Sequence, residues 1–340
     1  MLGCLNGAMT ALLVSVGHRT GLFDTMATMS PATSMLIADA AGLNERYVRE
    51  WLGGMTVARI VEHDAAKGTY WLPAEHAASI TRAAGPGNLA TLAEFVSLMG
   101  NVEDKIVRSF QEGGGVPYAA FPKFQELMGN LSGQVFDAAL IAGILPLVDG
   151  LPDRLTSGID VADLGCGQGH AINLMAQAYP MSRFTGYDFS DDGLATARAE
   201  TAAMALGNVT FEARDIATIG GPARFDVITA FDAIHDQAQP RKVLKGIADA
   251  LRPDGTFLMV DIAANSTHAG NMEHPMGPAM YTISTFHCMT VSLALGGEGL
   301  GNMWGEQTAR QLLSEAGFNN VIVKRVEGDM MNAYYICRKS

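Results

Sequence analysis

The first 150 residues are dominated by apolar positions that recur with helical spacing. This spacing predicts an apolar helix pair over residues 5–28 that breaks near Gly21, followed by a short helix over residues 34–41. Asn44 is placed to cap a further helix over residues 45–55. One face of that helix is apolar and carries Val48, Trp51, Leu52 and Met55.

A small hairpin is predicted directly after this helix, and together they form the pattern of a winged helix. Its strands are expected at residues 59–62 and 69–72. The would-be recognition helix has no net charge, because its charged residues are Glu45, Arg46, Arg49 and Glu50. DNA-binding faces are basic, so we predict that this domain, residues 1–83, serves packing or dimerisation. The apolar helix over residues 5–16 has little reason to be exposed, which predicts a homodimer.

Residues 84–150 are predicted to form a helical connector. The connector contains three consecutive glycines at 113–115 and an aromatic group made of Tyr118, Phe121 and Phe124. It is either a mobile loop over an ordinary core or a lid that closes on a ligand. Three glycines in a row are costly unless movement or a close backbone approach is needed, and this favours the lid.

From about residue 157 the pattern changes to strands that alternate with helices. This alternation predicts a parallel, doubly wound α/β sheet. The expected strands are residues 159–164, 183–188, 209–214, 225–231 and 256–262. A helix over residues 306–316 and strands near 321–326 and 333–338 complete the sheet. We therefore predict an α/β domain over residues 151–340, with a winged-helix domain before it.

Composition excludes several classes of protein. The 340 residues are 48% hydrophobic, which allows a large core and excludes global disorder. The net charge of −12 disfavours nucleic acid and anionic membranes as partners. The most apolar run, Ala138–Val148, is too short to span a membrane and contains Pro146. The four cysteines are far apart, so we expect no disulfide framework and a cytoplasmic protein.

The candidate chemistry lies at the ends of successive strands. Residues 163–169, Asp-Leu-Gly-Cys-Gly-Gln-Gly, follow an apolar strand and open a helix whose N-terminus favours negative charge. Asp188 ends the next strand, where a carboxylate can accept both hydroxyls of a ribose. Asp215 ends the strand after that and can accept from an adenine amino group. Three aspartates in register are unusual for simple helix caps and favour a nucleoside-containing cofactor.

These segments resemble the class I S-adenosylmethionine-dependent methyltransferases. Residues 163–169 look like the first motif of that family, Asp188 like its ribose-binding acid and Asp215 like its adenine-side acid. A Rossmann dehydrogenase would show a third glycine at the helix start, and residues 170–172 do not continue that pattern. The predicted cofactor-binding set is Asp163, Gly165, Cys166, Gly167, Asp188, Phe189, Asp215, Ile216, Phe231 and Tyr118.

A second resemblance, over residues 231–236, is to dimeric small-molecule O-methyltransferases that carry an N-terminal winged-helix dimerisation domain. In that family the histidine of this segment is the general base, and it falls on His235 here. Asp236 is a candidate to orient its ring, although adjacent residues on a helix do not face each other. Gln237 replaces the tryptophan that the family carries after the aspartate. The alternative role for His235 is a wall of the cofactor pocket.

The chain also resembles a bacterial branch of winged-helix methyltransferases. The shared segments are residues 44–52, 231–236, 287–293 and 299–301. Members of this branch mostly lack a defined substrate. Some related enzymes methylate sulfur, in small thiols or in the thioether precursor of dimethylsulfoniopropionate. The resemblance therefore implies the fold and the methyl donor but leaves the acceptor open.

An insertion over residues 263–305 is predicted to roof the substrate pocket. It contains histidines and a cysteine, which are good zinc ligands, but their spacing matches no closed zinc motif. We therefore expect no metal. The predicted substrate-binding set is Phe124, Tyr281, His287 and Trp304.

These observations predict an enzyme that transfers a methyl group from S-adenosylmethionine to a hydroxyl or thiol of a small molecule. A histidine titrates near neutral pH and suits removal of the acceptor's proton. One alternative is S-methylation of a small thioether acid, which needs no base. Another is a winged-helix regulator that senses S-adenosylmethionine, and the uncharged recognition helix disfavours it.

Overall fold

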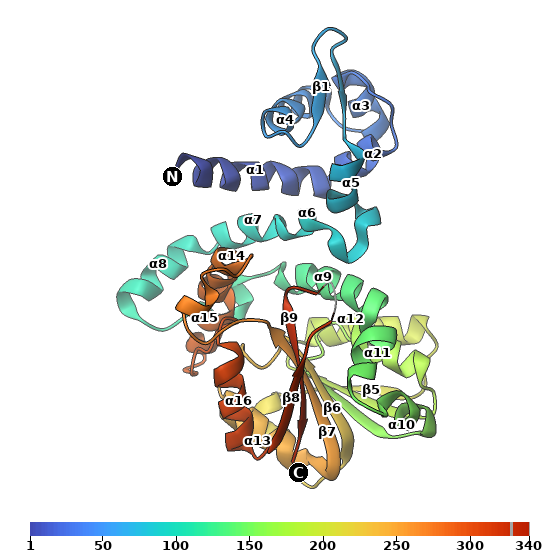
Figure 1. Cartoon of the computed structure of the whole chain (residues 1–340), viewed down its shortest axis with the longest axis vertical. Helices are drawn as coiled ribbons and strands as arrows, with labels where there is room; N and C mark the ends of the chain where they lie inside the picture. The colour runs from blue at the N-terminus through green and yellow to red at the C-terminus, as the bar shows by residue number, and fades with distance from the viewer. Residues whose placement is uncertain (327–328, 340) are drawn as a thin grey trace. The chain divides into compact units, whose positions relative to one another are not determined.

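A computed structural model describes residues 1–326 and 329–339. By its internal contacts the chain divides into two compact units, Met1–Asn101 and Val102–Ser340. Figure 1 shows the first unit in blue to cyan and the second in cyan to red. The expected order is therefore confirmed, with a helical unit containing a small hairpin followed by an α/β unit.

The first unit is a winged helix with additional helices. Its core is centred on Trp51, whose ring meets Phe23 edge-on at 5.2 Å and whose Nε1 donates to the Leu13 carbonyl at 2.8 Å. Asn44 caps α4 as predicted, because its side chain accepts from the Arg46 N–H. The elements are α1 (Leu2–Arg19), α2 (Leu22–Ala27), α3 (Ser34–Ala41), α4 (Glu45–Val57), β1 (Glu62–Asp64), β2 (Thr69–Trp71), α5 (Ala74–Ile80), α6 (Leu89–Leu92) and α7 (Glu94–Gly100).

The first strand of the wing begins three residues later than predicted. Arg59 has a φ of 60°, and the N–H groups of Ile60 and Val61 both donate to the Met55 carbonyl. These residues therefore complete the C-terminal turn of α4, and the backbone becomes extended only at Glu62. The apolar pair Ile60 and Val61 therefore belongs to this capping turn rather than to a strand.

The second unit is built on a seven-stranded sheet with the order β5-β4-β3-β6-β7-β9-β8. Strands β3 to β7 are parallel, and β9 runs antiparallel to both of its neighbours. The strands are β3 (Asp160–Leu164), β4 (Arg183–Asp188), β5 (Val209–Ala213), β6 (Phe225–Phe231), β7 (Leu251–Ile262), β8 (Asn320–Lys324) and β9 (Asn332–Arg338). The sheet and its order confirm the predicted α/β fold.

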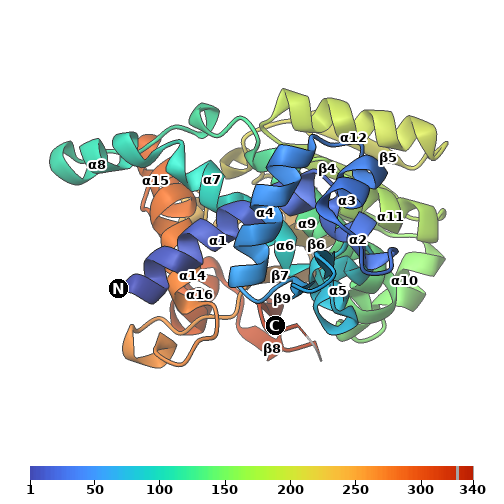
Figure 2. The ribbon, with the colours of Figure 1, turned by 90° about the horizontal axis from the view of Figure 1, so that it is seen from above.

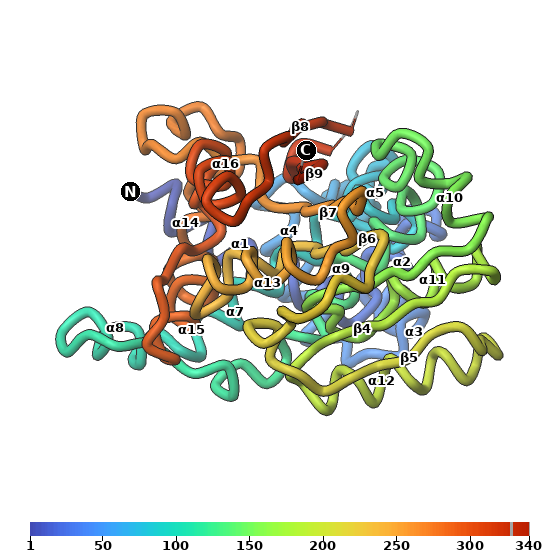
Figure 3. The backbone as a smooth tube through the Cα atoms, turned by 90° about the horizontal axis from the view of Figure 1, so that it is seen from below, coloured from blue at the N-terminus to red at the C-terminus, as the bar shows by residue number. Residues whose placement is uncertain are grey.

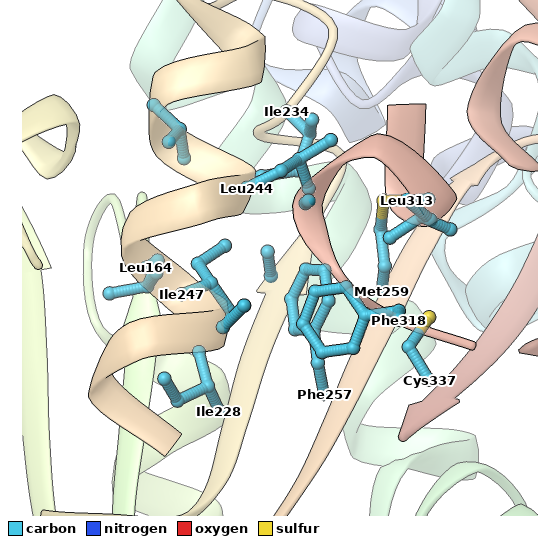
Figure 4. Packing of buried hydrophobic residues seen from close by; sticks show 14 of the residues in the cluster. Leu164, Ile228, Ile234, Leu244, Ile247, Phe257, Met259, Leu313, Phe318 and Cys337 are labelled. Carbon is cyan, nitrogen blue, oxygen red and sulfur yellow. The ribbon is translucent and has the colours of Figure 1, made fainter. Parts of the chain in front are cut away.

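Helices cover both faces of this sheet. One face packs against α13 (Pro240–Ala250) and α16 (Gly305–Ala316), and Figure 4 shows Leu244, Ile247 and Leu313 meeting Phe257 and Met259 there. The other face packs against α10 (Leu151–Ser157), α11 (His170–Ala178) and the segment that precedes them. Figure 3 shows these two groups of helices on opposite sides of the strands. Helix α12 (Asp191–Ala203) connects β4 to β5.

The connector contributes α8 (Glu103–Glu112) and α9 (Phe124–Ala139). Helix α9 continues through a π turn at Leu140–Ile144, and the whole stretch Phe124–Leu147 is long and apolar enough to cross a membrane by length and composition alone. In this fold Leu140 and Ile144 are buried against the sheet. The stretch therefore serves as a covering helix of the second unit.

A second π turn, Ser284–Cys288, lies in the insertion after β7. It joins α14 (Gly277–Ile283) to α15 (Met289–Ala294) without a break in the helical backbone. Figure 2 shows α14 and α15 as one rod, drawn in orange. Turns of this wider kind are rare and occur often at functional sites.

Candidate functional site

The glycine-rich turn after β3 begins beside a buried carboxylate. Asp163 accepts a hydrogen bond from the Thr229 hydroxyl at 2.6 Å, and burial raises the pKa of Asp163 to about 7. Gly165 has a φ of 68°, and its N–H donates to the Tyr187 carbonyl at 2.8 Å. A Cβ added at Gly165 would lie 2.5 Å from Cβ of Ala233. Glycine is therefore needed where this turn passes the segment after β6.

The acid at the end of β4 is bonded to this turn. Asp188 accepts from the Gly167 N–H at 2.8 Å and from the Ser190 N–H at 2.8 Å. Burial raises the pKa of Asp188, and these backbone hydrogen bonds act in the opposite direction. The structure thus brings together Gly165, Gly167 and Asp188, as their positions at successive strand ends predicted.

Several features of this edge fit S-adenosylmethionine. Asp188 presents a buried carboxylate, and the backbone at Gly167 faces open space, with nothing within 4 Å of an added Cβ. Phe189 is 61% exposed and offers an aromatic face next to that carboxylate. Asp215 is exposed at the end of β5, where it caps a short turn by accepting from the Ala217 N–H. These residues suit a ribose and an adenine.

His235 lies in the turn after β6 and is buried. Its Nδ1 lies 2.8 Å from Oδ1 of Asp261, which comes from the end of β7 and also accepts from the Ile262 N–H. Asp261 is a site residue that was not predicted from the sequence. Like Asp188, Asp261 lies at the end of a parallel strand, in Val260-Asp261-Ile262. The same argument from strand ends would therefore have identified it.

Asp236 occupies the other side of the His235 ring. Its Oδ1 lies 3.3 Å from Nε2, whereas Asp261 holds Nδ1. Burial alone would lower the pKa of His235, but the carboxylates of Asp261 and Asp236 outweigh it, and the pKa lies well above its usual value. The residue that orients the ring is therefore Asp261, and Asp236 pairs with the nitrogen that would face an acceptor.

His287 is the centre of an aromatic cluster. Its ring stacks on Phe124 with centroids 3.4 Å apart, and Tyr118 and Phe121 meet it edge-on at 5.4 and 4.8 Å. Tyr118 also contacts Phe189 at 5.3 Å. The cluster therefore joins predicted substrate residues to predicted cofactor residues.

The polar groups of His287 are unusual for a buried side chain. The residue is 0% exposed, and neither ring nitrogen has a hydrogen-bond partner among the residues that the structure describes. Burial lowers the pKa of His287 to about 4, so the ring is neutral. Its Nδ1 lies 4.0 Å from Oδ2 of Asp236. His235 and His287 thus both approach Asp236, although they come from segments that are far apart in the sequence.

The glycine triplet of the connector has a partly structural explanation. A Cβ at Gly115 would lie 2.0 Å from the Thr290 carbonyl oxygen, and the Val116 N–H donates to the Thr290 hydroxyl at 2.8 Å. Gly113 and Gly114 have positive φ and open surroundings. A close backbone approach therefore requires Gly115, and movement of the segment as a lid stays a prediction.

The remaining predicted residues lie away from the aromatic cluster or in the core. Tyr281 packs in a separate small cluster, and its hydroxyl accepts from Asn271 at 3.0 Å. Trp304 belongs to the hydrophobic core of the sheet, so the structure does not bring it to the predicted substrate position. The Ile216 side chain also packs in this core, directly after Asp215, and its part in cofactor binding stays a prediction. Phe231 ends β6 and packs edge-on against Phe136. The half-buried Cys166 lies in the glycine-rich turn.

Two family comparisons match the two parts of the chain. Residues 8–82 match the Rv2258c-like winged HTH domain, and residues 155–323 match a family described as methyltransferase domain. Trans-aconitate 2-methyltransferase of Deinococcus radiodurans is 34% identical over 111 residues, which are 33% of this chain and 40% of that protein. Ubiquinone biosynthesis O-methyltransferase of Idiomarina loihiensis is 29% identical over 36% of this chain and 51% of that protein. The chain thus spans about half, or less, of these relatives.

Solved structures resemble the chain over nearly its whole length. A putative O-methyltransferase from Nostoc punctiforme covers 99% of this chain and 98% of its own, with a TM-score of 0.76 and 16% identity. Human N-acetylserotonin methyltransferase, solved with S-adenosylmethionine, covers 99% and 96% with a TM-score of 0.72 and 16% identity. The chain therefore combines a segment that matches the Rv2258c-like winged HTH domain with one that matches a methyltransferase domain, and it has the fold of methyltransferases solved with S-adenosylmethionine.

Proposed function

We propose that the protein transfers a methyl group from S-adenosylmethionine to a hydroxyl or thiol of a small molecule. The observation that carries this proposal is the buried pair of His235 and Asp261, at the same edge of the sheet as Asp188 and the glycine-rich turn. The carboxyl ends of parallel strands share one edge, so a proton acceptor lies on the side where the donor would bind.

S-adenosylmethionine supplies an electrophilic methyl group when bound, and the chain supplies position and proton transfer. Asp188 and the Gly165–Gly167 backbone would hold its ribose and amino-acid parts. The cluster around His287 would exclude water and orient the acceptor, because a displacement needs the two reacting atoms in line. A neutral His287 without a hydrogen-bond partner can accept a hydrogen bond from a polar group of that acceptor, or donate one to it.

His235 would accept the acceptor's proton at Nε2. Asp261 holds Nδ1 and stabilises the charged ring that results. Asp236 must move away from Nε2 of His235 before the methyl acceptor can reach that nitrogen. Nε2 must also be unprotonated at that stage. A thioether has no proton to lose, so this arrangement favours hydroxyl or thiol acceptors over it.

The names of several relatives support a small acceptor with an oxygen nucleophile. One structural neighbour, NcsB1, was solved with S-adenosyl-L-homocysteine and 1,4-dihydroxy-2-naphthoic acid; it covers 97% of this chain and 96% of its own, with a TM-score of 0.65. Tyr118, half-buried beside the stacked Phe124 and His287, offers an aromatic face against which a flat ring can pack.

The test is a methyl-transfer assay that follows S-adenosylhomocysteine with matched phenol, aliphatic thiol and thioether acceptors. We expect turnover of a phenol or thiol, and a loss of roughly 10²–10⁴-fold in His235→Ala with S-adenosylmethionine binding retained. His63→Ala, a change in the winged-helix unit, is the control and should keep wild-type turnover. Turnover of the thioether alone, or normal turnover in His235→Ala, would contradict the proposal.

We also propose that the protein is a cytoplasmic homodimer. Helix α1 exposes a series of large apolar side chains, namely Leu2, Leu5, Met9, Leu12 and Val16. Exposed apolar surface of this extent is typical of an interface. All four cysteines are free, which is compatible with a reducing compartment.

A further inference from the structure

Three side chains of metal-ligating type, His235, Asp236 and Cys288, lie close together, and a fourth, His287, lies beside Asp236. His235 and Asp236 come from the turn after β6, and His287 and Cys288 come from the π turn Ser284–Cys288. Ligand atoms of His235, Asp236 and Cys288 all lie within 4.8 Å of one another. Nδ1 of His287 lies 4.0 Å from Asp236. Three of the ligand atoms therefore share one small region, and His287 lies next to it through Asp236.

The polar atoms of His287 are free to bind a ligand. His287 is fully buried, and both ring nitrogens lack a hydrogen-bond partner among the described residues. Leaving a buried polar atom unsatisfied costs roughly 1–3 kcal/mol. A ligand that bonds to these atoms would therefore relieve an existing cost.

The charge of the region favours a cation. Asp232, Asp236 and Asp261 all lie near His235. Buried charges need a compensating partner. Three carboxylates, of which Asp261 is buried and Asp232 and Asp236 are half-buried, suit a positive ion better than a neutral or anionic ligand.

We propose that Nε2 of His235, a carboxylate oxygen of Asp236, Nδ1 of His287 and Sγ of Cys288 bind one divalent transition-metal ion of the zinc type. Two imidazoles, a carboxylate and a thiolate are a complete tetrahedral set for zinc, and the sulfur selects against magnesium and calcium. Binding releases the Cys288 thiol proton, and any proton on Nε2, to solvent. No closed zinc motif is visible in the sequence because each pair of ligands comes from a different segment.

The position of Asp261 fits this assignment. Metal-ligating histidines usually donate their second ring N–H to a carboxylate, and Nδ1 of His235 already lies 2.8 Å from Asp261. A second grouping of Asp232, His235 and Asp261 lies on the Nδ1 side. That nitrogen is engaged by the hydrogen bond, so the Nε2 side is the better metal site.

The metal and the proposed proton transfer need the same nitrogen. With an ion on Nε2, His235 cannot accept a proton, so the metal-bound protein would be an inactive form. The metal site goes beyond the proposed function, and its binding readout does not depend on methyl transfer.

Cobalt(II) added to the full-length, chelator-treated protein provides the test. We expect one equivalent to bind with the strong absorption of tetrahedral cobalt and a sulfur-to-cobalt charge-transfer band, and zinc to displace it. Cys288→Ser should lose the charge-transfer band, and His287→Ala should weaken binding at least tenfold. Cys4→Ser, at an exposed cysteine, is the control and should keep the band. Asp261→Asn should weaken binding about 10–100-fold through its contact with His235.

Two results would overturn the site: a weak octahedral spectrum without the sulfur band, or equal cobalt affinity in Cys288→Ser and wild type. If Cys288→Ser does not fold, the thermal shift of the wild type decides, because an ion that binds only the native state must raise the melting temperature. Zinc should also stop methyl transfer and a chelator should restore it. Full activity at saturating zinc would show that metal binding and proton transfer do not compete for Nε2 of His235.

Discussion

Nδ1 of His235 and Oδ1 of Asp261 lie 2.8 Å apart, and both side chains are buried, at 4% and 0% exposure. The carboxylate is held in turn by the Ile262 N–H. This contact leaves Nε2 as the ring nitrogen that faces Asp236. The two residues therefore act as one unit, which a double-mutant cycle can measure.

We expect Asp261→Asn to lower kcat by roughly 10²–10⁴-fold, because the amide no longer orients and stabilises the charged ring. The double variant with His235→Ala should be no slower than the slower single variant, since residues that act as a unit are not additive. The measurement is kcat for all four proteins with the best acceptor. If the two losses in kcat multiply in the double variant, His235 and Asp261 act independently and the prediction is wrong.

Asp188→Ala should reduce S-adenosylmethionine affinity by about 10–100-fold. Hydrogen bonds to a charged group are worth roughly 1.5–3 kcal/mol, and the change also removes the acceptor that holds the Gly167 N–H. Calorimetry gives the affinity directly. Asp192→Ala, an exposed acid in the first turn of α12, is the matched control and should bind normally. Equal affinities in the two variants would remove Asp188 from the site.

Gly165→Ala should both destabilise the protein and impair donor binding. Left-handed backbone costs alanine roughly 1–2 kcal/mol, and the new Cβ would also lie 2.5 Å from Ala233. Gly42→Ala has a similar φ of 67° but no atom within 4 Å, so it isolates the backbone strain. Chemical denaturation of both variants separates the two causes. A loss in Gly165→Ala no larger than in Gly42→Ala would disprove the clash.

His170 makes the stability of the second unit depend on pH. Its two ring nitrogens lie 2.6 Å from Glu200 and 2.9 Å from Asp137, so it links α9, α11 and α12. Burial acts to lower the pKa of His170, but the two carboxylates outweigh it and raise the pKa. The stabilisation is therefore complete below the ordinary histidine pKa and disappears as the pH rises through the raised value.

The expected difference in unfolding free energy between wild type and His170→Gln is about 1 kcal/mol at pH 6, in favour of wild type. It should shrink at pH 9, where the ring is neutral. Denaturant unfolding at the two pH values measures this difference, with a substitution at an exposed histidine, His268→Gln, as the control. A difference that grows with pH would show that His170 binds these carboxylates as a neutral ring.

Removing residues 1–28 should convert a dimer into monomers or aggregates, because Leu5 and Met9 are 51% and 62% exposed in the single chain. A milder variant, Leu5→Lys with Met9→Lys, should give monomers that remain folded. Light scattering reports the mass, and Lys67→Glu at the wing is the control. Dimers of unchanged mass in both α1 variants would place the interface elsewhere.

Site residues at the ends of parallel strands could be predicted from the sequence. Contacts between residues far apart in the sequence could not. Asp188 and Gly167 follow from the register of parallel strands, and the same argument applied to β7 would have found Asp261. The stacking of His287 on Phe124 joins residues 163 positions apart, and nothing local in either segment signals it. Trp304 looked like a pocket residue because it is aromatic and lies in the roof insertion, but packing against the sheet accounts for it.

The π turn at Ser284–Cys288 sets the angle between the two ends of the α14–α15 rod. An α-helix rotates about 100° per residue, and the wider turn absorbs one additional residue without ending the helix. Deleting one residue there would restore regular pitch but rotate Thr290 away from the Val116 N–H that it now accepts. Chain length is therefore constrained at this point more tightly than amino-acid identity. A one-residue deletion inside the turn should be more disruptive than any conservative substitution within it.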